Sequence, residues 1–297
     1  MKKRYFLILS IIFLLTFSCK KTETPAYLFI SVEDFKVNTD NFNKDHGTEF
    51  DKGKLEALKE HNFRDVLVSL NGKELGYWQL PCTIPLLPDY SKENNIRVIP
   101  CTRLTYLTLK TQPYYFLSPQ ERFLTIEKEG VYSLKDLSFE YVKNITFHKF
   151  ETFEEYTDFK PHPKDSSKVT MEIINSKGKI SLEDTVAYFN VVTSPVVLEK
   201  GNRYYWEMDY YCDNGDMSTY LDVQSSSTIL PQQNLIEFPA TDSWKKVYID
   251  LSEVVIWVAG DAPKISVSLG IRGLKKSDAN AYFYFDNIKL ISMPAPY

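Results

Sequence analysis

The chain has 297 residues and a mass of 34.5 kDa, with 43% apolar and 25% charged residues. This balance excludes a globally disordered chain, and the low count of 11 glycines excludes a collagen-like one. A formal net charge of −4 offers no basic surface for phosphates, so nucleic-acid binding is not expected. The length predicts about two domains.

The N-terminus predicts export and lipid anchoring. A basic start at residues 2–4 precedes an apolar run, residues 5–17, which is too short to span a bilayer. The following Leu-Thr-Phe-Ser-Cys segment ends at Cys19 and resembles the lipobox of bacterial lipoproteins, in which the cysteine is lipidated. We therefore expect a lipoprotein signal peptide over residues 1–18 and a lipidated Cys19 opening a tether at 19–26. A retained signal anchor is the alternative.

This lipobox is similar to the loose lipoboxes of Bacteroidota lipoproteins. The resemblance implies an outer-membrane, lipid-anchored protein on the cell surface or the periplasmic face. Several acyl chains are needed for stable attachment, and a bacterial lipoprotein cysteine supplies them. A single acid, Glu23, lies just after the cysteine, so the sequence does not distinguish the two faces.

Residues 27–143 form the first of two regions, and their pattern predicts several strands. Residues 27–35 favour a strand, and residues 54–61 favour one or two helical turns. Asn71-Gly72 between apolar runs predicts a tight hairpin, because a type I′ turn needs positive φ at both central residues. The preceding apolar residues alternate on one face, as in a half-buried strand.

The amino-acid sequence of this region resembles that of a family of Bacteroidota lipoproteins whose first domain is a small, PEGA-like β-sandwich. The segments that carry it are NGKELG, LPCTIPLL and YYFLSP. The resemblance implies a structural domain and brings no catalytic residue. Two departures from the family pattern, Cys82 and Cys101, occur together and favour a disulfide, worth about 3 kcal/mol in the chain-entropy model. Two buried thiols are the alternative, and Cys212 is expected in a buried strand.

Residues 144–297 predict a second, larger β-sandwich. Residues 203–211 alternate large aromatics, which places Tyr204, Trp206, Met208 and Tyr210 on one face. Residues 265–271 alternate in the same way, with Ile, Val, Leu and Ile on one side and polar residues opposite. Such alternation is typical of half-buried antiparallel strands. Its recurrence predicts an all-β fold, in which a small N-terminal β-sandwich is followed by a larger jelly-roll β-sandwich.

This second region resembles a carbohydrate-binding-module-like jelly roll. The match rests on residues 243–252 (SWKKVYIDLS), on residues 281–291 (AYFYFDNIKLI) and on an opening Phe-Glu strand. The resemblance implies that Trp244 packs in the core. It also implies a structural calcium where the terminal strands pair, because calcium prefers oxygen ligands. The ligand candidates are Glu151, Glu154 and Asp286, and solvated charges at a sheet edge are the alternative.

Exposed aromatic side chains beside polar groups are the usual means of holding a sugar ring. The candidate glycan-binding residues are Trp206, Tyr211, Tyr220 and Trp257. Aromatic residues at a period of two are more often core, so core packing or protein contact is the stronger alternative. The tripeptide Asp184-Thr185-Val186 matches an O-glycosylation pattern of Bacteroidota envelope proteins, which makes Thr185 a candidate modification site.

Enzymatic activity is not expected. Asp209, Asp213 and Asp216 are the best cluster of carboxylates, but they lie in or beside a polar turn. The sequence contains no G-x-S-x-G, P-loop or G-x-G-x-x-G motif, and its four histidines share no metal-binding spacing.

The expected function is a non-catalytic, lipid-anchored accessory or scaffold subunit of an outer-membrane complex of the transport or β-barrel assembly type. Its aromatic β-sandwich faces would dock a protein partner. The alternative is a glycan-binding envelope lipoprotein that uses aromatic residues of the jelly roll. A row of exposed Trp or Tyr favours the glycan, and a broad apolar patch bridging both domains favours the protein partner.

Overall fold

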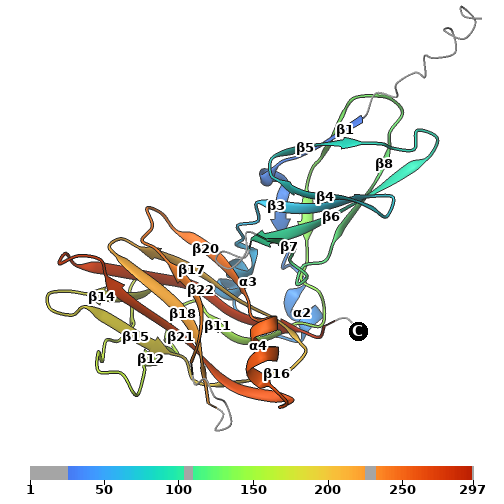
Figure 1. Cartoon of the computed structure of the whole chain (residues 1–297). Coiled ribbons are helices and arrows are strands. Elements are labelled where there is room, and N and C mark those ends of the chain that lie inside the picture. The colour runs from blue at the N-terminus through green and yellow to red at the C-terminus, as the bar shows by residue number, and fades with distance from the viewer. Residues whose placement is uncertain (1–25, 104–109, 225–231, 296–297) are drawn as a thin grey trace, which may run out of the picture.

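The computed structural model describes residues 26–103, 110–224 and 232–295. The expected signal peptide and lipidated Cys19 lie outside these residues. The all-β prediction is confirmed, and the strands fall into an N-terminal and a C-terminal half (Figure 1). No helix within the described ranges has the length and apolarity needed to cross a membrane.

The N-terminal half contains three small sheets and two short α-helices. Its sheets have the strand orders β5-β1-β9, β10-β2 and β4-β3-β6-β7, with β8 also pairing with β6. The elements are β1 (Ala26–Ile30), η1 (Val32–Asp34), β2 (Phe35–Val37), α2 (Phe42–His46), α3 (Lys52–Lys59), β3 (Asp65–Leu70), β4 (Lys73–Gln79), β5 (Cys82–Leu86), β6 (Glu93–Arg103), β7 (Thr111–Pro113), β8 (Gln120–Thr125), β9 (Val131–Leu134) and β10 (Leu137–Phe139).

Local signals place several of these elements. Asn71 and Gly72 have φ values of 51° and 79° and join β3 to β4, so the predicted hairpin is confirmed. The predicted helical turns are confirmed as α3, which begins after Asp51. The Asp51 carboxylate accepts a hydrogen bond from the Lys54 N–H at 2.8 Å and so caps a free donor of the first turn.

The predicted disulfide is not formed. Cys82 lies in β5 opposite Ile30, whereas Cys101 lies in β6 opposite Asp65, in a different sheet. Both thiols are free and buried, as is Cys212. Burial raises the pKa of Cys82 to about 11 and that of Cys101 to about 12, which keeps both as unreactive thiols. The alternative of small buried hydrophobes therefore describes them.

The C-terminal half is a sandwich of two antiparallel six-stranded sheets. The first, which we call the junction sheet, has the order β13-β14-β22-β17-β20, with β11 also on β22; the second, the outer sheet, has the order β12-β15-β21-β18-β19, with β16 also on β21. The elements are β11 (Thr146–Glu151), β12 (Lys160–Pro161), β13 (Glu172–Ile173), β14 (Gly178–Leu182), β15 (Tyr188–Val192), β16 (Val196–Glu199), β17 (Arg203–Cys212), β18 (Gly215–Val223), β19 (Gln232–Phe238), β20 (Lys245–Asp250), α4 (Ser252–Ala259), β21 (Lys264–Lys275) and β22 (Ala281–Met293).

The alternation of the sequence builds the core between these sheets. The inward residues of β17 and β21 are those predicted, and they pack together in one buried cluster: Tyr204, Trp206, Met208, Tyr210, Ile265, Val267, Leu269 and Ile271. Trp244 does not take the core position that the resemblance implied. It lies just before β20 and is 45% exposed. The prediction that it packs in the core is wrong.

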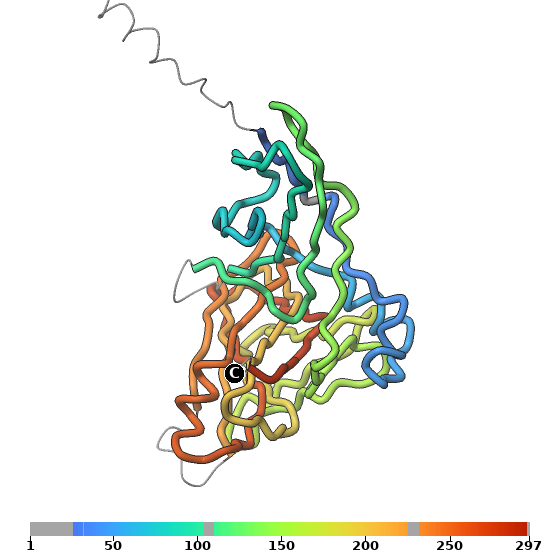
Figure 2. The backbone as a smooth tube through the Cα atoms, turned by 90° about the vertical axis from the view of Figure 1, so that its right-hand side faces the viewer, coloured from blue at the N-terminus to red at the C-terminus, as the bar shows by residue number. Residues whose placement is uncertain are grey.

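The two halves share a second hydrophobic cluster. Tyr205, Tyr248 and Ile291 point out of the junction sheet and pack into the core of the N-terminal half. Phe50, from the loop before α3, contacts the rings of Phe147 and Phe150 at centroid distances of 5.3 and 5.4 Å. Figure 2 shows this N-terminal segment, in blue, reaching along the C-terminal half. The N-terminal half therefore covers part of the junction sheet, while the outer sheet faces away from it (Figure 1).

Candidate functional site

A cavity of about 720 Å³ lies on the outward face of the outer sheet. The register sets side chains from four neighbouring strands in one row across its floor. Arg272 lies opposite Asn190 on one side and Ser218 on the other, and Ser218 lies opposite Glu237. Because strand residues two apart share a face, Tyr188, Leu274 and Asp216 form the next row. Two ordered rows of outward side chains therefore line one pocket.

Tyr188 supplies the aromatic surface of the cavity. It stands at the start of β15 and is 40% exposed, and its hydroxyl shares a hydrogen bond of 2.7 Å with the Ser166 hydroxyl. The exposed Leu274 lies beside it in the register. This bond fixes one edge of the ring and leaves an apolar surface at the rim.

The polar floor is oriented by a network beneath it. The Tyr220 hydroxyl donates a hydrogen bond of 2.6 Å to Asn190 Oδ1, and Asn190 Nδ2 donates one of 3.1 Å to Asp165. The Tyr220 ring can lie there because its neighbour across the sheet is Gly270, where a Cβ atom would come within 2.2 Å of the ring. Gly270 therefore makes room for the tyrosine that orients Asn190.

Arg272 is held in place from two sides. Its Nε donates to Ser218 Oγ at 3.0 Å, its Nη2 donates to Asn234 Oδ1 at 2.7 Å, and the guanidinium lies 5.5 Å from the Tyr220 ring centroid. A guanidinium has further N–H groups beyond the two used here. Arg272 is thus a fixed donor whose remaining N–H groups are available to a ligand.

The charge of the cavity lining is mainly negative. Asp165, Asp216 and Glu237 contribute carboxylates, and Arg272 is the cation among the lining residues. Lys276, outside the lining, pairs with Asp216 at 2.8 Å. Partial burial opposes ionisation of Asp165, but hydrogen bonds from Ser167 and Asn190 outweigh it and hold its pKa below the usual value. Carboxylates, amides and the guanidinium together accept and donate hydrogen bonds to hydroxyl groups.

The structure separates the four residues predicted to bind glycan. Trp206 is fully buried in the core, and Tyr220 is fully buried under Asn190 and Arg272, so neither offers a face to a ligand. Trp257 is 60% exposed on α4 and does not line the cavity. Tyr211 points outward from the junction sheet, on the opposite side of the sandwich. The predictions for Trp206 and Tyr220 are wrong, because alternation identifies two faces but does not say which face is covered. Those for Tyr211 and Trp257 stay predictions.

The residues proposed for calcium do not form a ligand set. The terminal strands β11 and β22 do pair, as the resemblance implied. However, Asp286 is paired with Lys177, Glu151 is buried beside the Asp158 N–H, and Glu154 accepts from Ser176. Within residues 26–103, 110–224 and 232–295, no cluster of His, Cys, Asp and Glu side chains could hold a metal ion. The prediction of calcium at these residues is wrong, because a lysine already neutralises the central carboxylate.

The turn carboxylates are also separated. Asp209 faces outward from the junction sheet and pairs with Lys246 at 2.8 Å, whereas Asp216 faces outward from the outer sheet. Asp213 accepts a hydrogen bond from the Tyr282 N–H at 2.9 Å. The three do not form the acid–base pair that a glycosidase needs. Thr185 lies in an exposed turn between β14 and β15, and its modification stays a prediction.

Sequence reasoning missed Tyr188, Asn190 and Arg272. A signal was present for one of them, since Arg272 belongs to the polar side of the alternating run that ends β21. No local signal joins it to Asn190, because that contact follows from the pairing of β15 with β21.

No protein-family model and no curated protein matches the chain. Among solved structures, a CBM4 carbohydrate-binding module is 13% identical, with a TM-score of 0.33, and the match covers 46% of this chain and 94% of that one. A family 29 module from Piromyces equi is 10% identical, with a TM-score of 0.33 over 50% and 89% of the two chains. The agarase AgWH50C is 11% identical, with a TM-score of 0.36 over 51% of this chain and 26% of that one. These likenesses concern the β-sandwich alone and are too distant to assign a function.

Proposed function

We propose that the protein is a non-catalytic glycan-binding protein and that the cavity of the outer sheet holds the glycan. The observation that carries this proposal is the cavity itself: a pre-oriented row of Asn190, Arg272, Ser218 and Glu237 beside the exposed ring of Tyr188. A sugar ring has an apolar face that stacks on an aromatic ring and hydroxyls that pair with such groups.

The charge of the cavity favours a neutral saccharide. Three carboxylates and one guanidinium line it, and Lys276 pairs with one of these carboxylates, Asp216, which leaves an excess of one negative charge. Like charges repel an anionic ligand over short distances. A neutral oligosaccharide meets no such repulsion, and its hydroxyls can donate to the carboxylates and accept from Arg272. We therefore assign neutral hexose oligomers as the ligand class.

Affinity electrophoresis tests this function. The purified chain is run through gels that contain soluble neutral polysaccharides, including a β-1,4-galactan, a β-glucan and a xyloglucan. We expect at least one polysaccharide to retard the protein, and Arg272→Ala to abolish most of the retardation. Trp257→Ala is the matched control, because this exposed side chain does not line the cavity. Retardation that survives Arg272→Ala, or no retardation by any neutral polysaccharide, contradicts the proposal.

The scaffold function expected from the sequence takes second place in this proposal. That expectation rested on aromatic faces available to a partner. Tyr205 and Tyr248, on the outward side of the junction sheet, instead pack against the N-terminal half of the same chain. Their apolar surface is therefore already buried within the chain.

Lipid anchoring at Cys19 stays a proposal that a labelling experiment checks. We expect cells fed an alkyne fatty acid to label the full chain, and Cys19→Ala to lose the label and appear in the soluble fraction. Unchanged labelling of Cys19→Ala would contradict the lipobox prediction.

A further inference from the structure

The chemical type of the side chains on the outward face of the junction sheet changes along its strands. Near the N-terminal half this face is apolar, then it carries ion pairs, and beyond these it is aromatic. The successive outward pairs of β17 and β22 are Tyr205 with Ile291, Glu207 with Lys289, Asp209 with Asp286, and Tyr211 with Tyr284. The apolar pair is buried against the N-terminal half, whereas the aromatic pair at the other end is only partly buried.

Three aromatic side chains form a row at this end of the sheet. The ring centroids of Tyr211 and Tyr284 are 5.9 Å apart, and those of Tyr211 and Trp244 are 6.4 Å apart. The planes differ by 39° and 35°, so neighbouring rings are tilted against each other. Trp244 is 45% exposed, although its sequence context predicted a core position. Contact between the apolar ring of this tryptophan and water is unfavourable, and a stacked ligand would remove that contact.

Lysines accompany this aromatic row. Lys177 Nζ lies 5.7 Å from the Trp244 centroid, and Lys179 Nζ lies 5.8 Å from the Tyr284 centroid. Lys179 stands directly opposite Tyr284 in the pairing of β14 with β22. Trp244 and Tyr284 therefore each have an ammonium group beside them, and a cation at this place can pair with an anion that stacks on the row.

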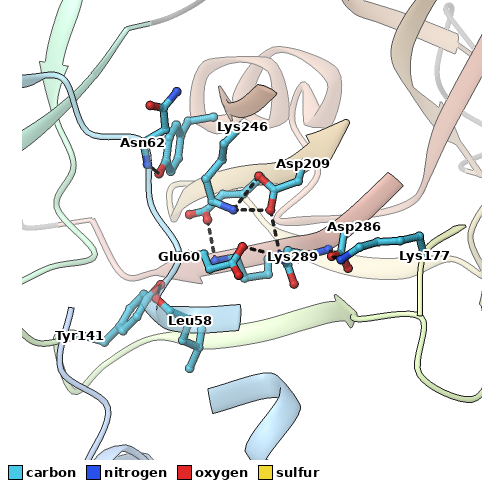
Figure 3. A network of polar contacts seen from close by, with 12 residues as sticks. Leu58, Glu60, Asn62, Tyr141, Lys177, Asp209, Lys246, Asp286 and Lys289 are labelled. Atoms are coloured by element: carbon cyan, nitrogen blue, oxygen red, sulfur yellow. Dashed lines mark hydrogen bonds and ion pairs between the residues drawn. The ribbon is translucent and has the colours of Figure 1, made fainter. Parts of the chain in front are cut away.

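Trp244, at one end of the row, also lines a cleft between the two halves. The cleft has a volume of about 520 Å³, and the N-terminal half contributes Glu60, His61, Asn62 and Arg64 to its lining. Figure 3 shows Asp209 and Lys246 bonded to each other at this place, with Lys177 beside Asp286. Of the lining residues of the C-terminal half, Lys177 and Lys245 are exposed by 40% and 47%.

The charge of this cleft is opposite to that of the outer-sheet cavity. Four cations, Arg64, Lys177, Lys245 and Lys246, line it against three carboxylates. Asp286 and Asp209 are paired with Lys177 and Lys246, and Lys245 is paired with Asp242 outside the lining. Lys179 adds another cation at the aromatic row. From this combination we infer that the cleft and the row of Trp244, Tyr211 and Tyr284 form a second ligand site, for an acidic saccharide that contains uronic-acid units. Its pyranose rings stack on the aromatic row and its carboxylates pair with Lys179 and Arg64.

Isothermal titration with hexagalacturonate and with a neutral β-1,4-galactohexaose tests this site. We expect hexagalacturonate to bind the whole protein and Trp244→Ala to weaken that binding about tenfold or more, because a stacked ring is lost. Lys179→Gln should weaken binding less and reduce its dependence on salt, since surface charges act through a screened interaction. Quenching of tryptophan fluorescence by the ligand should disappear in Trp244→Ala.

Two control variants separate this inference from the proposed function, which rests on other strands. Tyr188→Ala in the outer-sheet cavity and Trp257→Ala on α4 should both leave hexagalacturonate binding unchanged. Circular dichroism confirms that Trp244→Ala remains folded, as expected for a half-exposed side chain. The inference is overturned if hexagalacturonate fails to bind, if its binding is indifferent to Trp244→Ala, or if the neutral hexamer binds equally well at Trp244.

Discussion

At the scale of single residues, a buried ion pair marks the contact between the halves. Lys289 Nζ lies 2.9 Å from Glu207, and both side chains are 1% exposed. The hydroxyl of Tyr114, from the N-terminal half, donates a hydrogen bond to the same glutamate. Desolvating two charges costs free energy that only good geometry and additional hydrogen bonds recover. This trio therefore favours one particular docking of the two halves.

Replacing the lysine alone should lower the free energy of unfolding more than replacing both members of the ion pair. Lys289→Met leaves Glu207 buried without its partner, and we expect the free energy of unfolding to fall by about 3–5 kcal/mol. The double variant Lys289→Met/Glu207→Leu should recover much of this loss, because no charge is left unpaired. Urea denaturation of the three proteins measures the difference. A double variant less stable than Lys289→Met alone would contradict the description of this pair.

Two histidines should make stability depend on pH. Burial is the main cause that lowers the pKa values of His61 and His148 below the usual value. A histidine with a lowered folded-state pKa stabilises the fold above its unfolded pKa of about 6.5, and this contribution is lost as the pH falls below it. We expect the unfolding free energy to decrease between pH 7.5 and 5.5.

The variants His61→Gln and His148→Gln provide the matched test of this dependence. Each should flatten the pH profile, because the replaced group no longer titrates. Thermal unfolding at a series of pH values supplies the profile. An equally steep pH profile in the double variant His61→Gln/His148→Gln and in the parent protein would show that other groups cause the pH dependence of stability.

At the scale of elements, β21 connects the fold to the proposed ligand site. Gly270 leaves room for the Tyr220 ring, and Tyr220 in turn orients Asn190. A methyl group at position 270 would meet three ring atoms between 2.2 and 2.4 Å away, so the ring must move. If the cavity binds glycan as proposed, we expect its affinity to depend on this glycine.

Gly270→Ala should lower both stability and ligand affinity. Overpacking of this kind costs about 1–3 kcal/mol, and displacement of Tyr220 frees Asn190 from its hydrogen bond. The second-site change Tyr220→Leu should restore stability but not affinity, because it makes space without replacing the hydroxyl. Thermal unfolding and glycan titration of the two variants distinguish these effects. Full affinity in Gly270→Ala would show that Tyr220 does not orient the cavity.

The sequence predicted individual strands and turns better than it predicted which of them pack against one another. Asn71-Gly72 marked its hairpin because turn chemistry is local, and Ile265 to Ile271 marked the inner face of β21 because strand alternation is local. Trp244 was assigned to the core but is 45% exposed, and Trp206 was named as a glycan candidate but is buried in the core. Trp206 is buried because the two sheets of the C-terminal sandwich pack face to face, and that packing joins residues far apart in the chain. For the same reason no local pattern assembled Tyr188, Asn190 and Arg272 into one cavity.

At the scale of the whole molecule, the two halves are joined by more than a linker. The shared cluster places Tyr205, Tyr248 and Ile291 in the core of the N-terminal half, and Asn62 donates its N–H to the Tyr248 hydroxyl at 3.1 Å. Asn287 bridges them again, donating from Nδ2 to Glu60 at 3.1 Å. An interface that is both apolar and hydrogen-bonded should hold the halves in one orientation.

Cooperative unfolding is the expected consequence of this interface. Calorimetry of the full chain should give a single transition, whereas the fragment 144–297 should expose Tyr205, Tyr248 and their neighbours. We expect that fragment to self-associate and to bind a hydrophobic dye that the full chain does not bind. Two separate transitions in the full chain, or a monodisperse fragment of unchanged stability, would contradict a shared core.

The central claim is that the cavity of the outer sheet binds a neutral saccharide. A crystal structure of the protein with the neutral oligosaccharide that binds it best tests this claim most directly. We expect a sugar ring against Tyr188 and hydroxyls within hydrogen-bond distance of Arg272 and Asn190. A saccharide bound anywhere else on the molecule, with this cavity empty at saturating ligand, would contradict the assignment.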